Sequence, residues 1–315
     1  MGAIFNRLAI LGQGLIGSSI TRAVYAQRVT GEVVITDSSP KVRQRLREIG
    51  LGAARVVDSN AEAVAGADLV IACVPVGRYG ALVKEIAGAF QDGAVFTDVG
   101  SVKGSVVRDV VAELPARVQF VPAHPLAGTE RSGPDSGLKD LFENRWCILT
   151  PTEATAPAAV EKVKSFWHAL GSTVEIMSVA HHDYVLAVTS HLPHLIAFTI
   201  FHTALRHEQR TETEVIKFSA GGFRDFTRIA SSNPTMWRDI FLNNKEAVLK
   251  VLNEFNADIA ALADAIEHGD AEKLVKDLTT SRLTRRKVIE KEHISLAPKK
   301  PAAEVPIVPP YGWSD

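Results

Sequence analysis

Short apolar runs alternate with stretches of helical periodicity over the first 178 residues of the chain. The apolar runs are nearly continuous in Val, Ile, Leu and Phe, which is typical of strands in a parallel sheet covered on both faces. We predict such strands at residues 7–12, 32–37, 67–75, 93–100 and 118–123. Residues 15–27 and 78–90 repeat apolar positions every three or four residues, which predicts helices, and residues 145–177 predict a further strand–helix–strand unit. This order predicts a Rossmann-like, doubly wound, mainly parallel α/β sheet.

The pattern changes after Ser178, because no convincing strand occurs from there to about residue 295. Residues 187–205 form a long, largely apolar helix pattern, and residues 243–270 form a long amphipathic one that ends at Gly269. Asn233 followed by Pro234 is typical of a helix start. We therefore predict three regions, which are a Rossmann-like domain at 1–178, an all-helical domain at 179–295 and a Pro-rich tail at 296–315.

Composition and charge limit the classes of partner. The 315 residues carry 35 basic and 36 acidic side chains, so no general basic field is present to hold nucleic acid or an anionic membrane. The chain enters a strand and a glycine-rich turn almost at once, without the charged and apolar segments of a secretory signal. Cys73 and Cys147 lie in apolar contexts and are expected to be buried free thiols, as in a reducing compartment. We expect a cytoplasmic protein with no nucleic acid or membrane partner.

The apolar stretch 187–205 is long enough to raise the question of a membrane span. It contains three histidines and Pro193, and no second span is paired with it. A buried helix, in a helical domain or in the core of a homodimer, is therefore the favoured interpretation.

A glycine-rich motif follows the first predicted strand. Gly12, Gly14 and Gly17 occupy the glycine positions of GxGxxG, and Leu15 and Ile16 lie between the last two. In this motif the first glycine permits a tight turn, the second lets a pyrophosphate approach the backbone, and the third lets the helix pack on the strand. The N-terminus of that helix then faces the phosphates with its partial positive charge. A glycine-rich turn without a ligand is the alternative.

Asp37 ends the second predicted strand, twenty residues after Gly17. A carboxylate at this place accepts hydrogen bonds from both ribose hydroxyls and repels a 2′-phosphate, so we predict NAD rather than NADP as the cofactor. A purely structural turn residue is the alternative for Asp37.

Two later turns carry candidate catalytic residues. Ser101 follows the strand at 93–100, and His124 lies between Pro122 and Pro125 at the end of the strand at 118–123. Prolines on both sides hold a histidine in a rigid, extended segment, which suits a general base that must meet one hydroxyl. By itself, His124 fits a structural loop histidine equally well.

The helical half adds histidines and arginines. His191 and His194 lie three residues apart on an apolar helix, but no third ligand supports a metal, and we predict none. Arg228 lies among aromatic residues, where a guanidinium usually binds a carboxylate. That carboxylate is either Asp225 of the same segment or a substrate.

Six motifs occur in a fixed order, namely GQGLIG, TDVGSVK, HPLAGTE, TSHLPH, GGFRDFTRIA and NPTMWRDIF. Together they resemble the prephenate/arogenate (cyclohexadienyl) dehydrogenase family of tyrosine biosynthesis, over roughly residues 6–293. The resemblance implies a Rossmann-like domain followed by a helical dimerisation domain. It also implies oxidative decarboxylation of a cyclohexadienyl acid by NAD(P).

The resemblance implies roles for individual residues. His124 is similar to the catalytic histidine of the family, and Ser101 to the serine between substrate and nicotinamide. Arg228 would bind the ring carboxylate. The full set that would bind substrate is His191, Arg228, Thr129 and Glu130.

Two other functions are weighed against this one. A β-hydroxyacid dehydrogenase of the same architecture would use a lysine in the helical domain, and we find no matching lysine motif. A non-catalytic NAD-binding regulator would be expected to lack His124, Ser101 or Arg228, and all three are present. The choice between prephenate and arogenate stays open at this point.

Overall fold

The computed structural model describes residues 4–129, 131–212 and 214–295. The chain divides into two compact units, residues 1–254 and 255–315. The predicted Pro-rich tail, 296–315, lies outside the described residues. The predicted boundary at residue 178 falls inside the first unit and stays a proposal.

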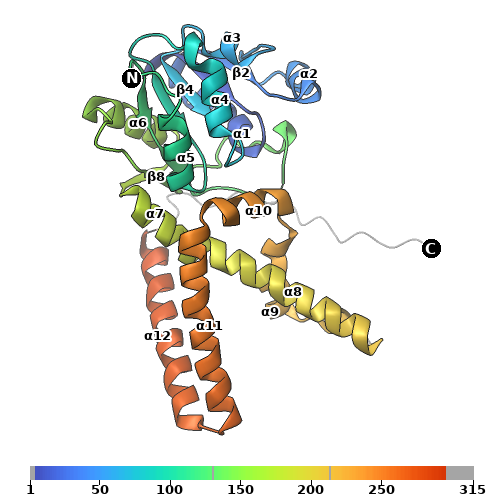
Figure 1. Cartoon of the computed structure of the whole chain (residues 1–315). Coiled ribbons are helices and arrows are strands. Elements are labelled where there is room, and N and C mark those ends of the chain that lie inside the picture. The colour runs from blue at the N-terminus through green and yellow to red at the C-terminus, as the bar shows by residue number, and fades with distance from the viewer. Residues whose placement is uncertain (1–3, 130, 213, 296–315) are drawn as a thin grey trace, which may run out of the picture. The chain divides into compact units, whose positions relative to one another are not determined.

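A six-stranded parallel sheet forms the centre of the first unit (Figure 1). Its strands are β1 (Phe5–Leu11), β2 (Thr30–Thr36), β3 (Arg55–Val56), β4 (Leu69–Ala72), β5 (Val95–Asp98) and β6 (Gln119–Val121). They lie side by side in the order β3-β2-β1-β4-β5-β6, and every neighbouring pair is parallel. The predicted doubly wound sheet is therefore confirmed. Of these six strands, only β3 was not predicted, because two residues give no periodic pattern.

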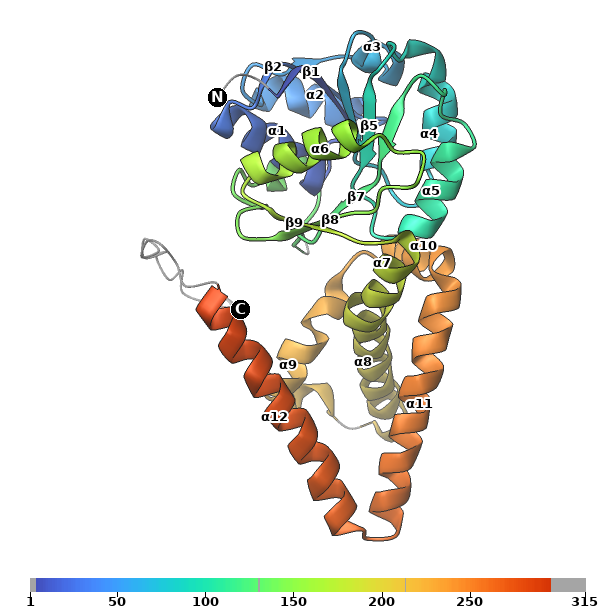
Figure 2. The same cartoon turned by 90° about the vertical axis from the view of Figure 1, so that its left-hand side faces the viewer.

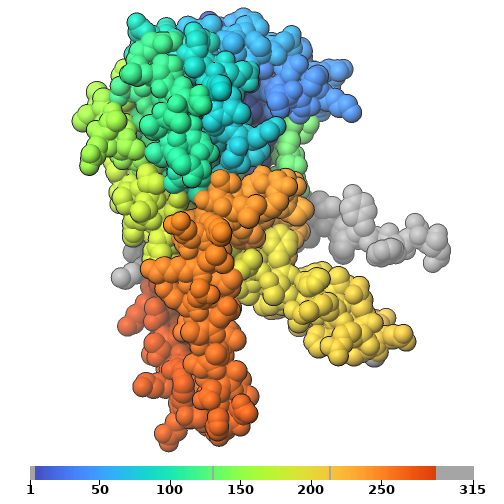
Figure 3. All heavy atoms as spheres, viewed as in Figure 1, coloured from blue at the N-terminus to red at the C-terminus, as the bar shows by residue number. Residues whose placement is uncertain are grey.

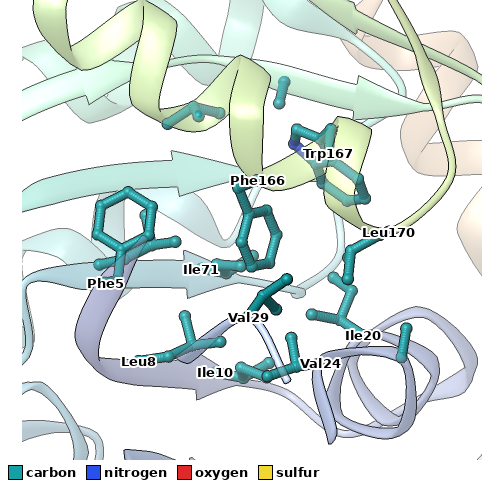
Figure 4. Close-up of a cluster of buried hydrophobic side chains, with 14 of the residues drawn as sticks. Phe5, Leu8, Ile10, Ile20, Val24, Val29, Ile71, Phe166, Trp167 and Leu170 are labelled. Carbon is teal, nitrogen blue, oxygen red and sulfur yellow. The ribbon is translucent and has the colours of Figure 1, made fainter. Parts of the chain in front are cut away.

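Residues of β1 alternate between two buried layers, which is why this strand is apolar throughout. Leu8 and Ile10 join the layer formed with α1 (Leu15–Gln27) and α6 (Pro157–Ala169), which Figure 4 shows. Ala9 and Leu11 join the layer on the other face, which contains residues of three further helices, α3 (Asn60–Val64), α4 (Tyr79–Ile86) and α5 (Lys103–Val111). The other helix of this region is α2 (Pro40–Ile49).

The chain leaves the parallel sheet at Pro122. Strand β7 (Ala123–Pro125) pairs antiparallel with β8 (Trp146–Leu149), and β8 pairs parallel with β9 (Thr173–Ile176) in a second, three-stranded sheet. The prediction of one strand over 118–123 with His124 beyond its end is therefore wrong. Because Pro122 has no N–H to donate, the parallel ladder stops there, and His124 lies inside β7. Helix α6 connects β8 to β9, as the predicted strand–helix–strand unit requires.

In the described residues 177–212 and 214–295 the regular elements are all helical. They are α7 (Val179–Leu186), a π turn (Ala187–His191), α8 (Leu192–Thr211), α9 (Gly221–Thr227), α10 (Pro234–Asn243), α11 (Lys245–Glu267) and α12 (Ala271–Ser295). Short 3₁₀ turns occur at Ala87–Ala89, Pro134–Ser136, Ile216–Phe218 and Arg228–Ser231.

The helix predicted at 187–205 is in fact longer and interrupted. The π turn ends at His191, two residues before Pro193, which is the second residue of α8. Proline has no N–H, and its ring would crowd the carbonyl of Thr189 four residues earlier in a regular α-helix. A widened turn relieves this conflict. The predicted start of α10 is confirmed, because Asn233 Oδ1 accepts hydrogen bonds from the first backbone N–H groups of that helix.

The helical stretch Val179–Thr211 is long and apolar enough, by length and composition alone, to cross a membrane. Core helices of soluble proteins meet the same criteria, but only 28% of its most apolar window is buried within this chain. Val188, Ile200 and Phe201 are exposed, and Figure 3 shows side chains of α8 uncovered on the face that is drawn. An exposed apolar surface of this kind indicates that another surface covers it.

The second unit is a helical hairpin made by the end of α11, from Phe255 onward, and by α12 (Figure 2). Gly269 makes the turn between them at φ +66°, a backbone conformation that glycine adopts at little cost. The prediction that this helix ends at Gly269 is therefore confirmed. Both helices carry exposed apolar residues, namely Ile259, Ile266, Val275, Leu278, Leu283 and Val288.

Candidate active site

The turn between β1 and α1 requires two of its three glycines for steric reasons. Gly12 has φ +91°, and a Cβ added there would lie 2.4 Å from the carbonyl oxygen of Cys73. A Cβ at Gly17 would lie 2.0 Å from the carbonyl oxygen of Gly12. These contacts bring the turn against the end of β4 and bring α1 against the turn, as the motif predicts.

Gly14 is different, because no atom lies within 4 Å of the position that its Cβ would occupy. It is the N-cap of α1, and no side chain caps this helix. Leu15 and Ile16 begin the helix and pack on the buried layer beside β1. The start of α1 therefore has open space beside Gly14 and no side-chain cap, which fits the pyrophosphate of a dinucleotide.

Asp37 follows β2 and is half-buried beside this turn. Its Oδ2 accepts a hydrogen bond of 2.8 Å from the N–H of Gln13, and its Oδ1 accepts one of 2.9 Å from the N–H of Ser39. The carboxylate is thus held next to the glycine turn, with lone pairs left for a ribose. The role of Asp37 in cofactor choice stays a prediction.

A buried ion pair connects the turn that carries Ser101 to the strand that carries His124. Lys103 and Asp98 are both fully buried and paired with each other. Asp98 also accepts a hydrogen bond from the N–H of Ala123, and Lys103 donates one to the carbonyl of Ala123. Two side chains of the β5–α5 turn therefore fix both backbone groups of the residue before His124.

His124 is 9% exposed and pairs in register with Ile148 of β8. Burial, and then the nearby charges of His182, Lys103 and His191, hold the pKa of His124 well below its usual value. The ring is therefore neutral at physiological pH, which is the state that a general base requires.

A second histidine, on α7, contacts the first. His124 Nδ1 lies 2.9 Å from His182 Nε2, and His182 Nδ1 lies 2.8 Å from Asp183 Oδ1. The carboxylate of Asp183 also accepts hydrogen bonds from the N–H groups of Lys103 and Gly104 at the start of α5. Neither His182 nor Asp183 is predicted from the sequence, because a His–Asp pair in a short helix gives no sign of its distant contacts.

His191 lies in the π turn and is also buried. Asn244 Nδ2 donates to the carbonyl of Asp183 and lies 3.0 Å from His191 Nδ1, so this ring nitrogen must accept. Burial lowers the pKa of His191 to about 4, and a neutral ring then carries its hydrogen on Nε2. Within the described residues Nε2 has no hydrogen-bond partner. His191 thus offers a donor to a ligand, as its predicted role requires.

His194 stacks on Trp237 of α10, with ring centroids 3.7 Å apart. Burial lowers the pKa of His194, and the positive charge of Arg228 lowers it further, which indicates that the guanidinium is near this ring. Among the described residues no ion pair joins Arg228 to Asp225, the internal partner considered above. Trp237 also lies beside His191, so this one ring of α10 contacts both His191 and His194.

The other predicted catalytic and substrate-binding residues are Ser101, Thr129 and Glu130. Ser101 is half-buried, three residues after Asp98. Thr129 is exposed in the loop after β7, where its hydroxyl accepts a hydrogen bond from the N–H of Arg131. Glu130 lies outside the described residues.

Neither cysteine pairs with the other or takes part in a metal site. Cys73 and Cys147 are free thiols, and Cys147 is buried. Within residues 4–129, 131–212 and 214–295, no three His, Cys, Asp or Glu side chains gather as metal ligands.

Two family models match the sequence. The first, described as "Prephenate dehydrogenase, nucleotide-binding domain", matches residues 20–176, and the second, described as "Prephenate dehydrogenase, dimerization domain", matches residues 178–280. The match changes from one model to the other where strands give way to helices.

Several known proteins are similar over most of the chain. A cyclohexadienyl dehydrogenase of Zymomonas mobilis is 42% identical over 282 residues, which are 90% of this chain and 96% of the relative. A prephenate dehydrogenase of Bacillus subtilis is 36% identical, over 90% of this chain and 76% of the relative. The crystal structure of prephenate dehydrogenase from Aquifex aeolicus, in complex with hydroxyphenyl propionate and NAD⁺, has a TM-score of 0.83 at 35% identity and covers 90% of this chain and 98% of that one.

Proposed function

This chain belongs to the prephenate dehydrogenase family, and from that premise we propose that it catalyses the NAD-dependent oxidative decarboxylation of prephenate to 4-hydroxyphenylpyruvate in tyrosine biosynthesis. The observation that carries the proposal is His124, a buried, neutral histidine attached through Ala123 to the turn of Ser101. From the helical half, His182 contacts this ring directly and His191 is near enough to affect its pKa.

Each end of the substrate has a candidate partner. The cyclohexadienyl ring bears a hydroxyl at C4 and, across the ring, a carboxylate at C1. His124 takes the hydroxyl proton, and Ser101 lies between this hydroxyl and the cofactor. Arg228 binds the ring carboxylate through its planar guanidinium, and His191 donates from Nε2. Thr129 and Glu130 are the other two residues that we propose to bind the substrate.

The cofactor-binding residues are those of the β1–α1 turn, Gly12, Gly14, Leu15, Ile16 and Gly17, together with Asp37 after β2. The open space above Gly14 and the uncapped start of α1 support this assignment. When bound, NAD accepts a hydride from C4 of the substrate. A measurement of kcat/KM with NAD and with NADP tests Asp37, and NADP used as well as NAD would contradict its role.

An absorbance assay with NAD and prephenate tests the activity. We expect one NADH and one carbon dioxide for each prephenate consumed. A β-hydroxyacid dehydrogenase would instead form NADH from a β-hydroxyacid and leave prephenate unchanged. A non-catalytic regulator would bind NAD without turnover of either compound.

Arogenate is the second candidate substrate, since a relative 42% identical to this chain is named a cyclohexadienyl dehydrogenase. Prephenate has a pyruvyl side chain and arogenate has an alanyl one, so the two differ only at C1 of the ring. The ratio of kcat/KM for the two acids decides which one is preferred.

We further propose that the protein is a cytoplasmic homodimer that binds neither membranes nor nucleic acid. The match of residues 178–280 to a dimerisation domain supports the dimer, because it coincides with the region of uncovered apolar helices. Cell fractionation tests the location, and recovery of the chain in the membrane fraction would contradict it.

A further inference from the structure

His124, His182 and Asp183 form a chain of hydrogen bonds, which we call the α7 relay. The other contacts of Asp183 determine where the hydrogen between Asp183 and His182 lies. Its two oxygens accept hydrogen bonds of 2.7 Å from the N–H groups of Lys103 and Gly104, at the positive N-terminus of α5. Burial alone would raise the pKa of Asp183, but the hydrogen bonds from His182 and from these N–H groups lower it overall. An ionised carboxylate can only accept, so the hydrogen between Asp183 and His182 must be on His182 Nδ1.

The second hydrogen follows from the first. Burial lowers the pKa of His182, against the opposing effect of Asp183, so the ring is neutral and its Nε2 is a bare acceptor. His124 Nδ1, 2.9 Å away, must therefore donate to it. Because His124 is also neutral, its Nε2 is left with the free lone pair.

We propose that His182 and Asp183 are positioning residues that hold His124 in the one tautomer able to act as base, with the hydrogen on Nδ1 and the lone pair on Nε2. The proposal rests on the function proposed above, in which His124 receives the C4 hydroxyl proton. It also gives a role to His182 and Asp183, whose hydrogen bonds join them to each other, to His124 and to the start of α5.

The proton that His124 takes from the substrate returns to the product, so the reaction needs no other proton donor or acceptor. The O–H bond of the C4 hydroxyl breaks, and its proton goes to His124 Nε2 as the hydride leaves C4. The C1–carboxylate bond then breaks, carbon dioxide leaves, and its electron pair makes the ring aromatic. The ring oxygen takes the proton back from His124, so no net proton is released. During the intermediate stage the His124 imidazolium donates to His182, which Asp183 polarises.

Other charged groups also face this pair. Lys103 lies near both rings, but Asp98 balances its charge through a direct ion pair. His191 faces His124 and is itself held neutral by burial. Among the described groups, Asp183 is therefore the anion that acts on the ring of His182 through a hydrogen bond.

Two substitutions of His182 separate positioning from folding. His182→Phe keeps a ring but removes the acceptor for His124 Nδ1, whereas His182→Gln restores an acceptor oxygen near that place. We expect His182→Phe to lower kcat by about 10²-fold or more, with KM for prephenate and Kd for NAD within a few fold of wild type. His182→Gln should recover a large part of kcat. His181→Phe, at the exposed neighbouring histidine, is the matched control and should leave kcat unchanged.

A direct measurement of the tautomer does not depend on any variant of His182. In wild-type protein labelled with ¹⁵N-histidine, the His124 signals are those absent from His124→Asn. We expect Nδ1 to report an attached hydrogen and Nε2 a bare nitrogen. A bare Nδ1 in the wild type would overturn the proposal, as would a folded His182→Phe with wild-type kcat. If the wild type fails to oxidise prephenate, the proposed function is wrong, and the NMR result still decides the tautomer.

Discussion

His124 connects the electrostatics of the buried site to the rate of the reaction. His124→Asn keeps a polar side chain of similar size but removes a base that can accept a full proton. We expect kcat to fall by about 10²–10⁴-fold, which is the usual contribution of general base catalysis. NAD affinity should stay unchanged, because Gly12 and Asp37 lie on other turns. Steady-state kinetics measures kcat, and a titration with NAD measures the affinity for NAD. A near-wild-type kcat would show that His124 is not the general base.

The pH dependence follows from the same burial. The pKa of His124 lies well below the usual value, which for histidine is about 6.5, so the base stays neutral into mildly acidic solution. We expect kcat/KM to stay level as the pH falls through about 6.5 and to decrease only at lower pH.

The stability of the fold depends on pH in a different way. His124, His182 and His191 bind protons more readily in the unfolded chain, so the free energy of unfolding falls as the pH falls below about 6.5.

Urea unfolding at a series of pH values checks this second effect. The window extends from about 6.5, where unfolded histidine titrates, to about 4, the pKa of folded His191. A urea midpoint that stays constant over this window would show that the three histidines are not held neutral in the folded state.

Arg228 is tested through the substrate rather than through the fold. Arg228→Ala should raise KM for prephenate and cost about 2–4 kcal/mol in kcat/KM, because the ring carboxylate loses its charged partner. Arg228→Lys should recover only part of this, since an ammonium keeps the charge but not the planar fork. Arg224→Ala is the matched control, because Arg224 lies on α9, one helical turn before Arg228, and donates to the carbonyl of Ser219. Joint loss of NAD binding and of melting temperature in Arg228→Ala would instead assign it a structural role.

At the scale of an element, the β1–α1 turn offers a matched pair of glycines. Gly12→Ala would force φ +91° on alanine and bring its Cβ against the backbone of Cys73, so we expect a clear loss of melting temperature. Gly14→Ala meets no atom of the chain within 4 Å, so its melting temperature should match the wild type. Its methyl group would instead occupy the space of the pyrophosphate and weaken NAD binding. Wild-type NAD affinity in Gly14→Ala would place the cofactor elsewhere.

The corner between β5 and β7 depends on the pair of Lys103 with Asp98. Lys103→Met removes the cation and leaves a fully buried carboxylate, for which we expect a loss of about 3–5 kcal/mol in the free energy of unfolding. Lys84→Met, at an exposed position of α4, is the control and should change stability little. Urea denaturation measures the stability of both variants. A Lys103→Met midpoint equal to that of the wild type would mean that the Lys103–Asp98 pair does not stabilise this corner.

These elements also show which parts of the site a sequence can reveal. The glycine turn, and the position of Asp37 beside it, were predictable because both belong to one local strand–turn–helix–strand segment. The α7 relay was not, since His182 meets His124 across 58 residues and Asp183 meets Lys103 across 80. No pattern near residue 182 records those contacts. The change of sheet at Pro122 has a local sign, since a proline cannot donate to a ladder, but the same proline also predicts a rigid, extended segment.

At the scale of the whole molecule, the uncovered apolar residues are concentrated after residue 178. Val188, Ile200 and Phe201 lie in or just before α8, and a further set lies on α11 and α12. The family model that matches residues 178–280 is a dimerisation domain, so we expect a second copy of the chain to bury these surfaces. Burial of those side chains in a homodimer would also explain why a stretch with the hydropathy of a membrane span belongs to an enzyme of this family.

Light scattering at micromolar concentration tests the dimer. We expect twice the chain mass of 34.0 kDa for the wild type. Phe201→Glu places a charge on a side chain that is 40% exposed in the single chain, so it should favour the monomer without unfolding the sheet domain. Val111→Glu is the matched control, because Val111 is an even more exposed apolar residue at the end of α5, outside the helical region, and this change should leave a dimer. A wild-type monomer would contradict the proposed assembly, whereas a dimer disrupted only by Val111→Glu would move the interface to the sheet domain.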